Sequence, residues 1–230
     1  LEWPRVGAVT GFLSPNQQYV ATAAQHFADM PITLVSLRQQ KLIATWAVEG
    51  VSFQTYSLPV WTADNRLFFF IQDTLYRASP ADGYNEAQEV LKLDPGASFV
   101  TVNRQGTQIA FRRDRHLWLA NIDGSDARQI TTSKTLDYMQ YHGERRPTFS
   151  PDGRHIAFTG ATTRGATWSD YDYRDKSWVS VTGGEFGYVA IVPADGRLYD
   201  LDDKESGAIW LRKTAKGKAG VPCGGNLFWR

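Results

Sequence analysis

The stretch Arg146-Pro147-Thr148-Phe149-Ser150-Pro151-Asp152-Gly153-Arg154-His155-Ile156-Ala157-Phe158 decides the fold of this chain. Its middle, residues 150–153, has the composition of a tight turn. Proline presets φ, aspartate bonds its own backbone, and glycine adopts positive φ without steric cost. The segments on either side, 147–149 and 155–158, have the composition of short strands, so the stretch predicts a β-hairpin.

This hairpin recurs along the chain. The third residue of the turn falls at positions 16, 64, 105, 152 and 195, at spacings of 48, 41, 47 and 43 residues. An apolar strand follows each turn, and a second strand follows in every unit but the fourth, where 170–173 matches less well. Several short strands in each period of about 40 to 50 residues are the signature of β-propeller blades. The five turns are Ser14-Pro15-Asn16-Gln17, Thr62-Ala63-Asp64-Asn65, Asn103-Arg104-Gln105-Gly106, Ser150-Pro151-Asp152-Gly153 and Pro193-Ala194-Asp195-Gly196.

We therefore predict one all-β domain over residues 1–230, a β-propeller of four-stranded blades. Residues 226–229 have the pattern of an entry strand and 1–5 that of an outer strand. This leaves open a sixth blade that is either split between the two ends or truncated. The five recognisable blades span about 6–48, 58–93, 97–131, 146–182 and 185–221. We expect the core at or beside Phe12, Val20, Trp61, Phe69, Ile109, Trp118, Phe149, Ile156 and Trp210.

The identity of the last residue of each turn indicates which turn conformation is favourable. Gly153 suits a left-handed conformation, and Asn65 of the second unit tolerates it. The first unit has Gln17 at this position, which leaves a different turn type open there.

The motif Ser150–Phe158 resembles the core of the TolB-like β-propeller repeats. The third unit resembles it as well, with Gln105–Phe111, then His116-Leu117-Trp118, and finally Asp123-Gly124 and Arg128–Thr131. The resemblance covers nearly the whole chain. It implies a protein–protein interaction role in a bacterial cell envelope, at a periplasmic or otherwise extracytoplasmic location. The motif itself marks turns and packing, and it does not mark a reaction centre.

Composition excludes several classes of partner. With 25 basic and 24 acidic residues the net charge is +1, which argues against a general affinity for nucleic acid. No stretch approaches the roughly 20 apolar residues of a membrane helix, so we predict no direct membrane insertion. The single cysteine, Cys223, excludes an intramolecular disulfide and a multi-cysteine metal site. We expect no cofactor and no metal, because the four histidines are dispersed and 170–175 holds only a fragment of a calcium loop.

The connections between blades are the candidate functional segments, because in this family they lie at the mouth of the ring. The connection ending in Asp137–Arg146 is the richest, with aromatic side chains and both signs of charge. Such a cluster is suited to binding an acidic peptide terminus, or to placing His142 and Glu144 for metal binding or proton transfer. The alternative is a solvated polar loop that packs its tyrosines over the ring. The predicted binding residues are Tyr138, Tyr141, His142, Glu144, Arg145 and Arg146.

Two functions follow as hypotheses. The first is a noncatalytic scaffold that binds a protein or peptide partner, with no catalytic residue assigned. The second is the propeller domain of a larger enzyme, either the gate of a prolyl-oligopeptidase-like hydrolase or a lyase or glycosidase with its site at the ring mouth. The sequence holds no Gly-x-Ser-x-Gly elbow and no phosphate-binding glycine loop.

Overall fold

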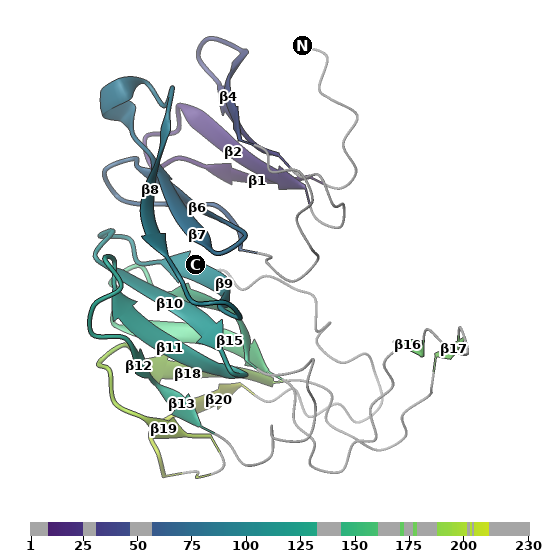
Figure 1. Ribbon diagram of the computed structural model, residues 1–230, viewed down its shortest axis with the longest axis vertical. Helices are drawn as coiled ribbons and strands as arrows, with labels where there is room; N and C mark the ends of the chain where they lie inside the picture. Colours follow the sequence, from purple (N-terminus) through teal and green to yellow (C-terminus); the bar gives the residue numbers. More distant parts are fainter. Residues whose placement is uncertain are drawn as a thin grey trace.

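The computed structural model describes residues 9–24, 31–46, 57–132, 144–160, 171–172, 177–178, 188–201, 203 and 205–211. Within these ranges the regular elements are β-strands apart from one short 3-10 helix, η1 (Pro80–Asp82). Four antiparallel sheets of four strands each follow one another as the blades of a propeller (Figure 1). The predicted all-β propeller of four-stranded blades is thereby confirmed.

The first three blades each consist of four strands that are neighbours in both sequence and space. Short hairpin turns connect most of these strands, as expected for antiparallel sheets. Blade 1 contains β1 (Val9–Leu13), β2 (Tyr19–Ala24), β3 (Ile32–Ser36) and β4 (Lys41–Trp46). Blade 2 contains β5 (Val60–Trp61), β6 (Leu67–Ile71), β7 (Thr74–Ala78) and β8 (Ala87–Lys92). Blade 3 contains β9 (Ser98–Val102), β10 (Gln108–Arg113), β11 (His116–Asn121) and β12 (Arg128–Gln129).

The fourth sheet corrects the predicted blade count. Its third strand pairs with its second from His155↔Pro193 to Gly160↔Tyr188, so the strand expected to open a fifth blade over 185–221 belongs to the fourth blade. The described residues therefore form four blades. Blade 4 contains β14 (Arg145–Phe149), β15 (His155–Gly160), β18 (Tyr188–Pro193) and β20 (Ile209–Leu211).

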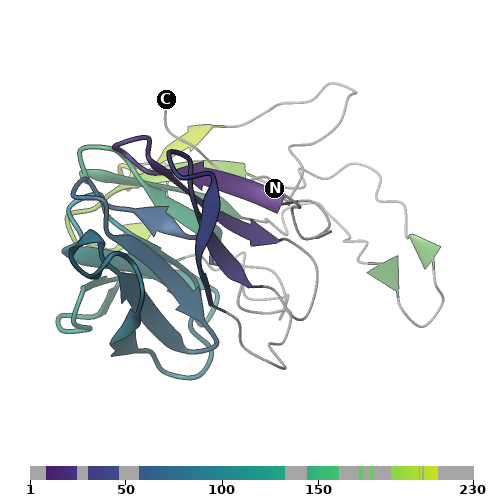
Figure 2. The same cartoon turned by 90° about the horizontal axis from the view of Figure 1, so that it is seen from above.

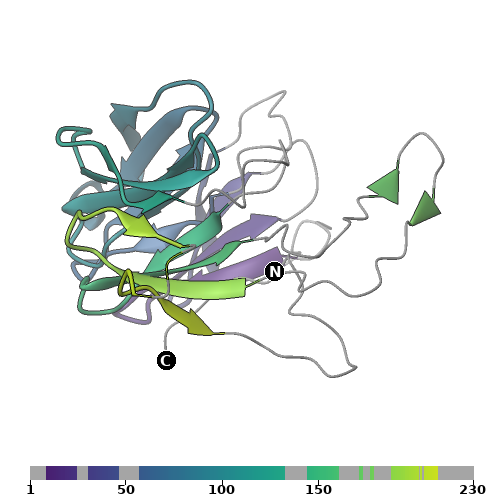
Figure 3. The ribbon, with the colours of Figure 1, turned by 90° about the horizontal axis from the view of Figure 1, so that it is seen from below.

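An insertion explains this error. Residues 161–187 separate the second and third strands of blade 4, so β18 begins at the distance along the chain where a new repeat would be expected. The weakly matching segment near 170 holds β16 (Tyr171–Asp172) and β17 (Ser177–Trp178), which pair only with each other. This hairpin lies apart from the four sheets in all three views (Figures 1, 2 and 3).

A small parallel pair ties blades 3 and 4 together. β13 (Thr131–Thr132) continues the outer strand of blade 3 and pairs with β19 (Tyr199–Asp200), which lies between β18 and β20 in the sequence. Two further backbone bonds extend the pair, from Tyr199 N to Ile130 O at 2.9 Å and from Leu201 N to Thr132 O at 2.8 Å. The segment between β18 and β20 thus pairs with the chain that continues the outer strand of blade 3.

The core lies between successive blades. In β6, Leu67 and Phe69 pack toward blade 1, whereas Phe68 and Phe70 pack toward blade 3. A strand buried on both faces must be apolar at every position, which explains the continuous run of residues 67–70. A third cluster, which includes Leu117 and Phe158, joins blades 3 and 4 in the same way.

Most of the expected core residues that the structure describes lie in or against these clusters. Phe69, Ile109, Phe149 and Ile156 are buried, and Phe12, Trp61 and Trp118 are partly buried against a cluster. Val20 is half-buried on the face of blade 1 that points away from blade 2. The Trp210 side chain lies outside the described residues.

The five predicted turns share one backbone conformation. Their last residues all have positive φ: 59° at Gln17, 62° at Asn65, 72° at Gly106, 74° at Gly153 and 79° at Gly196. The first turn therefore keeps the left-handed residue of the others although it lacks glycine.

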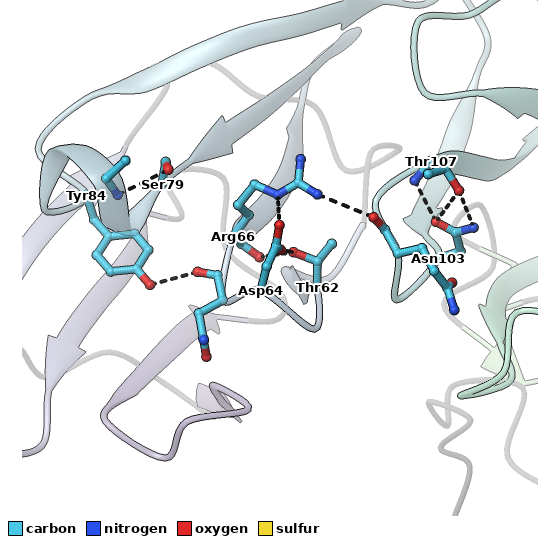
Figure 4. Close-up of polar contacts among 10 residues, drawn as sticks. Thr62, Asp64, Arg66, Ser79, Tyr84, Asn103 and Thr107 are labelled. Atoms are coloured by element: carbon cyan, nitrogen blue, oxygen red, sulfur yellow. Dashed lines mark hydrogen bonds and ion pairs between the residues drawn. The ribbon is translucent and has the colours of Figure 1, made fainter.

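Side chains fix these turns and link them from blade to blade. In the second turn Thr62 Oγ1 donates to Asp64 Oδ1 at 2.6 Å, and Arg66 Nε donates to Asp64 Oδ2 at 2.7 Å (Figure 4). Arg66 Nη2 also donates to Gln105 O in the third turn at 3.3 Å. The face that carries the turns at 14–17, 62–65, 103–106 and 150–153, called the turn face below, is therefore engaged in inter-blade hydrogen bonds.

Candidate functional site

The opposite ends of the strands form what we call the connection face. It carries the hairpin turns 72–73 and 114–115 and the chain segments that lead from one blade to the next, of which 93–97 and the flanks of 133–143 are described. The antiparallel order of the strands places these segments together, because every second turn of such a sheet falls at the same end.

The structure describes three of the six predicted binding residues. Tyr138, Tyr141 and His142 lie outside the described residues. Glu144 directly precedes β14, and Arg145 and Arg146 are its first two residues.

Glu144 is buried, with 0% of its side chain exposed. Its Oε2 accepts the backbone N–H of Leu117 at 2.7 Å and also the hydroxyl of Thr131. Its backbone N–H donates to Arg115 O at 2.9 Å. A buried carboxylate needs such donors because an unpaired buried charge costs several kcal/mol. Glu144 therefore contacts blade 3 and presents no oxygen at the surface.

Thr131 and His116 complete this polar cluster, and neither was among the predicted binding residues. The Thr131 hydroxyl oxygen accepts the same Leu117 N–H at 2.9 Å, and Thr131 is also fully buried. His116 Nδ1 lies 3.5 Å from Glu144 Oε1, and its side chain is 17% exposed. The cluster forms where β12 ends, at the point where the N–H of Leu117 in β11 loses its ladder partner.

Comparison of the blades shows that Glu144 departs from the repeat. The innermost strands β9 and β14 have the same register against their neighbours, including a bulge at the same place. On this register Glu144 holds the position in blade 4 that Ala97 holds in blade 3, where a small buried apolar residue packs. The matched pairs are Ser98↔Arg112 with Arg145↔Thr159, and Thr101↔Ala110 with Thr148↔Ala157.

The bulge itself has an unusual backbone. Phe99 in blade 3 and Arg146 in blade 4 are equivalent residues, and both have φ of 54°. A left-handed conformation is uncommon for such side chains, and it recurs at strained positions near binding sites. Arg146 is half-buried, and the side chain of Arg145 lies outside the described residues.

Surface ion pairs lie elsewhere on the described part of the connection face. Arg113 Nη1 lies 3.0 Å from Asp94 Oδ2, and its guanidinium lies 5.0 Å above the Trp118 ring. Lys92 Nζ lies 3.3 Å from Asp73 Oδ2, and the hydroxyl of Thr74 together with this lysine lowers the pKa of Asp73. Exposed pairs of this kind contribute little to stability, so they leave this face polar and charged without fixing it rigidly.

In the part of the chain that the structure describes, no three His, Cys, Asp or Glu side chains are close enough to hold a metal ion together. Across the same residues, no helix has the length and apolar character needed to cross a membrane. Glu144, the acidic residue among the predicted set, already accepts the donors around it.

Comparisons with known proteins concern the fold. No protein-family model and no curated protein matches this chain. A solved structure from Agrobacterium tumefaciens assigned as TolB matches with a TM-score of 0.51 at 15% identity, over 84% of this chain and 65% of that one. TolB from Acinetobacter baumannii matches with a TM-score of 0.49 at 14% identity, over 83% and 53% of the two chains. This chain thus spans less than two thirds of either structure, and what it shares with the first is the fold of a TolB-like β-propeller.

Proposed function

We propose that this protein is a noncatalytic scaffold whose connection face binds a protein or peptide partner, at an extracytoplasmic location in a bacterial cell envelope. The observation that carries the proposal is that buried hydrogen bonds hold both ends of one connection between blades. The segment 133–143 is flanked by Thr131 and Glu144, which hydrogen-bond to each other and to Leu117 of blade 3. Binding residues on a loop act best when a rigid scaffold positions that loop.

The residue types of this connection favour a macromolecular partner. Tyr138 and Tyr141 belong to this connection, and Arg145 and Arg146 directly follow Glu144. Tyrosine and arginine are enriched at the energetically dominant positions of protein interfaces. Arginine also binds carboxylates through two parallel hydrogen bonds, so an acidic peptide segment is the partner chemistry that we propose.

The turn face offers less for binding. Several of its backbone and side-chain groups bond between blades, as in the bonds from Ala63 N to Arg104 O at 2.8 Å and from Asn16 N to Asn65 Oδ1 at 2.9 Å. The connection face is therefore the better candidate for an interaction surface.

The test begins with capture of a partner from a cell-envelope extract by cross-linking, followed by affinity measurement with the purified partner. We expect the double variant Tyr141→Ala/Arg145→Ala to lose at least tenfold in affinity while its thermal unfolding stays nearly unchanged. Arg104→Ala/Arg154→Ala, two exposed arginines on the turn face, is the matched control and should bind as the wild type does. Retained affinity in the first variant, or loss in the control, would contradict the proposal.

A further inference from the structure

The buried cluster around Glu144 joins two points that are remote in sequence and adjacent in space. Thr131 stands before the connection 133–143 and Glu144 stands after it, and the Thr131 hydroxyl donates to the Glu144 carboxylate. The two ends of the connection are therefore tied to each other directly.

Each end is also tied to the blades. Backbone bonds to β19 hold the Ile130–Thr132 segment on one side, at 2.9 Å and 2.8 Å. On the other side Glu144 is held by the N–H of Leu117 in β11 and by the carbonyl of Arg115 in the turn that precedes β11. Both ends of the connection are thus fixed near the start of β11, an interior strand of blade 3, beside the apolar cluster that contains Leu117 and Ile130.

A carboxylate is costly at this position, which indicates a specific role. The equivalent residue of blade 3 is Ala97, so the blade itself can be built with a small apolar side chain there. In blade 3 the preceding connection is short, running from Asp94 with a bond from Ala97 N to Asp94 O at 3.1 Å. Of these two blades, blade 4 follows the longer connection, and it is the one with glutamate at this position.

We propose that Glu144 is the positioning residue of the connection face. Its carboxylate does not contact the partner. It holds Thr131 and the start of β14 together, and so fixes the two points between which the 133–143 connection runs. Tying the ends of a loop removes part of its conformational freedom before binding, which lowers the entropic cost of capture. The benefit of this positioning to binding rests on the proposed function. The contact between Thr131 and Glu144 can be tested without a partner.

The experiment is amide hydrogen exchange on the full chain and three variants, with overlapping peptides that isolate the Leu117 amide. Glu144→Ala removes the tie, Thr131→Val removes one bond at nearly constant volume, and Glu144→Gln keeps an acceptor oxygen in the same place. Glu86→Gln, at an exposed glutamate of blade 2, is the control.

We expect Glu144→Ala to raise exchange of the Leu117 amide at least tenfold and to speed deuterium uptake in peptides covering 133–143. Thr131→Val should show the same pattern more weakly, and Glu144→Gln should restore most of the lost protection. The strands β6 and β10 should exchange as in the wild type in every variant, and Glu86→Gln should change nothing.

Three outcomes would overturn the assignment. One is uptake over 133–143 that is equal in the wild type and in Glu144→Ala. Another is faster exchange spread equally over β10 and β15, which would make Glu144 a general packing residue. The third is a Glu144→Gln variant as loose as Glu144→Ala. The double variant Tyr141→Ala/Arg145→Ala should leave Leu117 exchange unchanged, so failure of the binding proposal and failure of this one are distinguishable.

Discussion

Asn65 links the first two blades, because its side-chain oxygen accepts the backbone N–H of Asn16 at 2.9 Å. The same residue has φ of 62°, and its carbonyl accepts the hydroxyl of the buried Tyr84 at 2.7 Å (Figure 4). Burial raises the pKa of Tyr84, so that hydroxyl keeps its proton and remains a donor. One turn residue thus combines a left-handed backbone, a bond between blades and a bond within its own blade.

Two substitutions at Asn65 separate these roles. Asn65→Gly keeps the left-handed conformation and loses only the bond to Asn16, so we expect a loss of about 0.5 kcal/mol in the free energy of unfolding. Asn65→Ala loses the bond and also strains the backbone, which adds about 1 kcal/mol. Urea denaturation of both variants measures the difference. Equal losses would show that the conformation costs alanine nothing here.

Gly153→Val is expected to destabilise the protein by more than about 1 kcal/mol, because a β-branched residue is strained at φ of 74°. A Cβ at this position would also approach Gln105 Oε1 of the neighbouring blade to 3.1 Å. Gly153→Asn is the milder control, since asparagine tolerates this conformation. An unchanged melting temperature for the valine variant would contradict the expectation.

The first turn offers a stabilising change. Gln17 is exposed and has φ of 59°, where the equivalent residues of the third to fifth turns are glycines. Gln17→Gly removes the strain of a left-handed side chain, offset in part by the greater freedom of glycine in the unfolded chain. We expect a net gain of about 0.5 kcal/mol in the free energy of unfolding. Thermal denaturation checks it, and a lower melting temperature would count against the shared turn conformation.

Acid should weaken the turns. The Ser150 hydroxyl and the N–H of Arg154 lower the pKa of Asp152 in the folded protein. A lowered folded-state pKa contributes stability above the unfolded value of about 3.9, and that stability is lost as pH falls through the folded value. Asp152→Asn should therefore flatten the decline in stability below pH 4.

Asparagine already occupies the equivalent position of the first turn. There Asn16 Oδ1 accepts the Ser14 hydroxyl at 2.7 Å and the N–H of Gln18 at 3.1 Å. Asparagine at position 152 should thus keep the turn geometry and remove only the titration. Urea denaturation at several pH values between 7 and 2 gives the comparison. A variant that declines as steeply as the wild type would contradict the assignment to Asp152.

The hairpin repeat could be predicted from the sequence because its determinants are local. All five turns end in a left-handed residue, and in the first, second and fourth a serine or threonine hydroxyl bonds the aspartate or asparagine two positions later, as in Ser150 and Asp152. The order of strands in blade 4 is not local. The turn at Pro193-Ala194-Asp195-Gly196 has the pattern of a repeat, and only the pairing of β18 with β15 across the insertion shows that it belongs to the previous blade.

The burial of Glu144 could not be predicted either, because it too depends on contacts between distant segments. Its neighbours 142–146 are polar and charged, which is the pattern of a solvated loop. Its burial depends on the N–H of Leu117 and the hydroxyl of Thr131, which come from other segments. Alignment of Glu144 with Ala97 was the available signal, and it requires the register of both inner strands.

The parallel pair β13–β19 has a consequence for the order of folding. Blades 1 to 3 close through neighbouring hairpins, whereas β19 follows β18 and must wait until residues 161–187 have been made and β18 has docked on β15. Until then the outer edge of blade 3 at Thr131–Thr132 has unpaired backbone groups, and such an edge can pair with another chain. During synthesis on the ribosome this edge is therefore the place where we expect chaperone dependence and misassembly to concentrate.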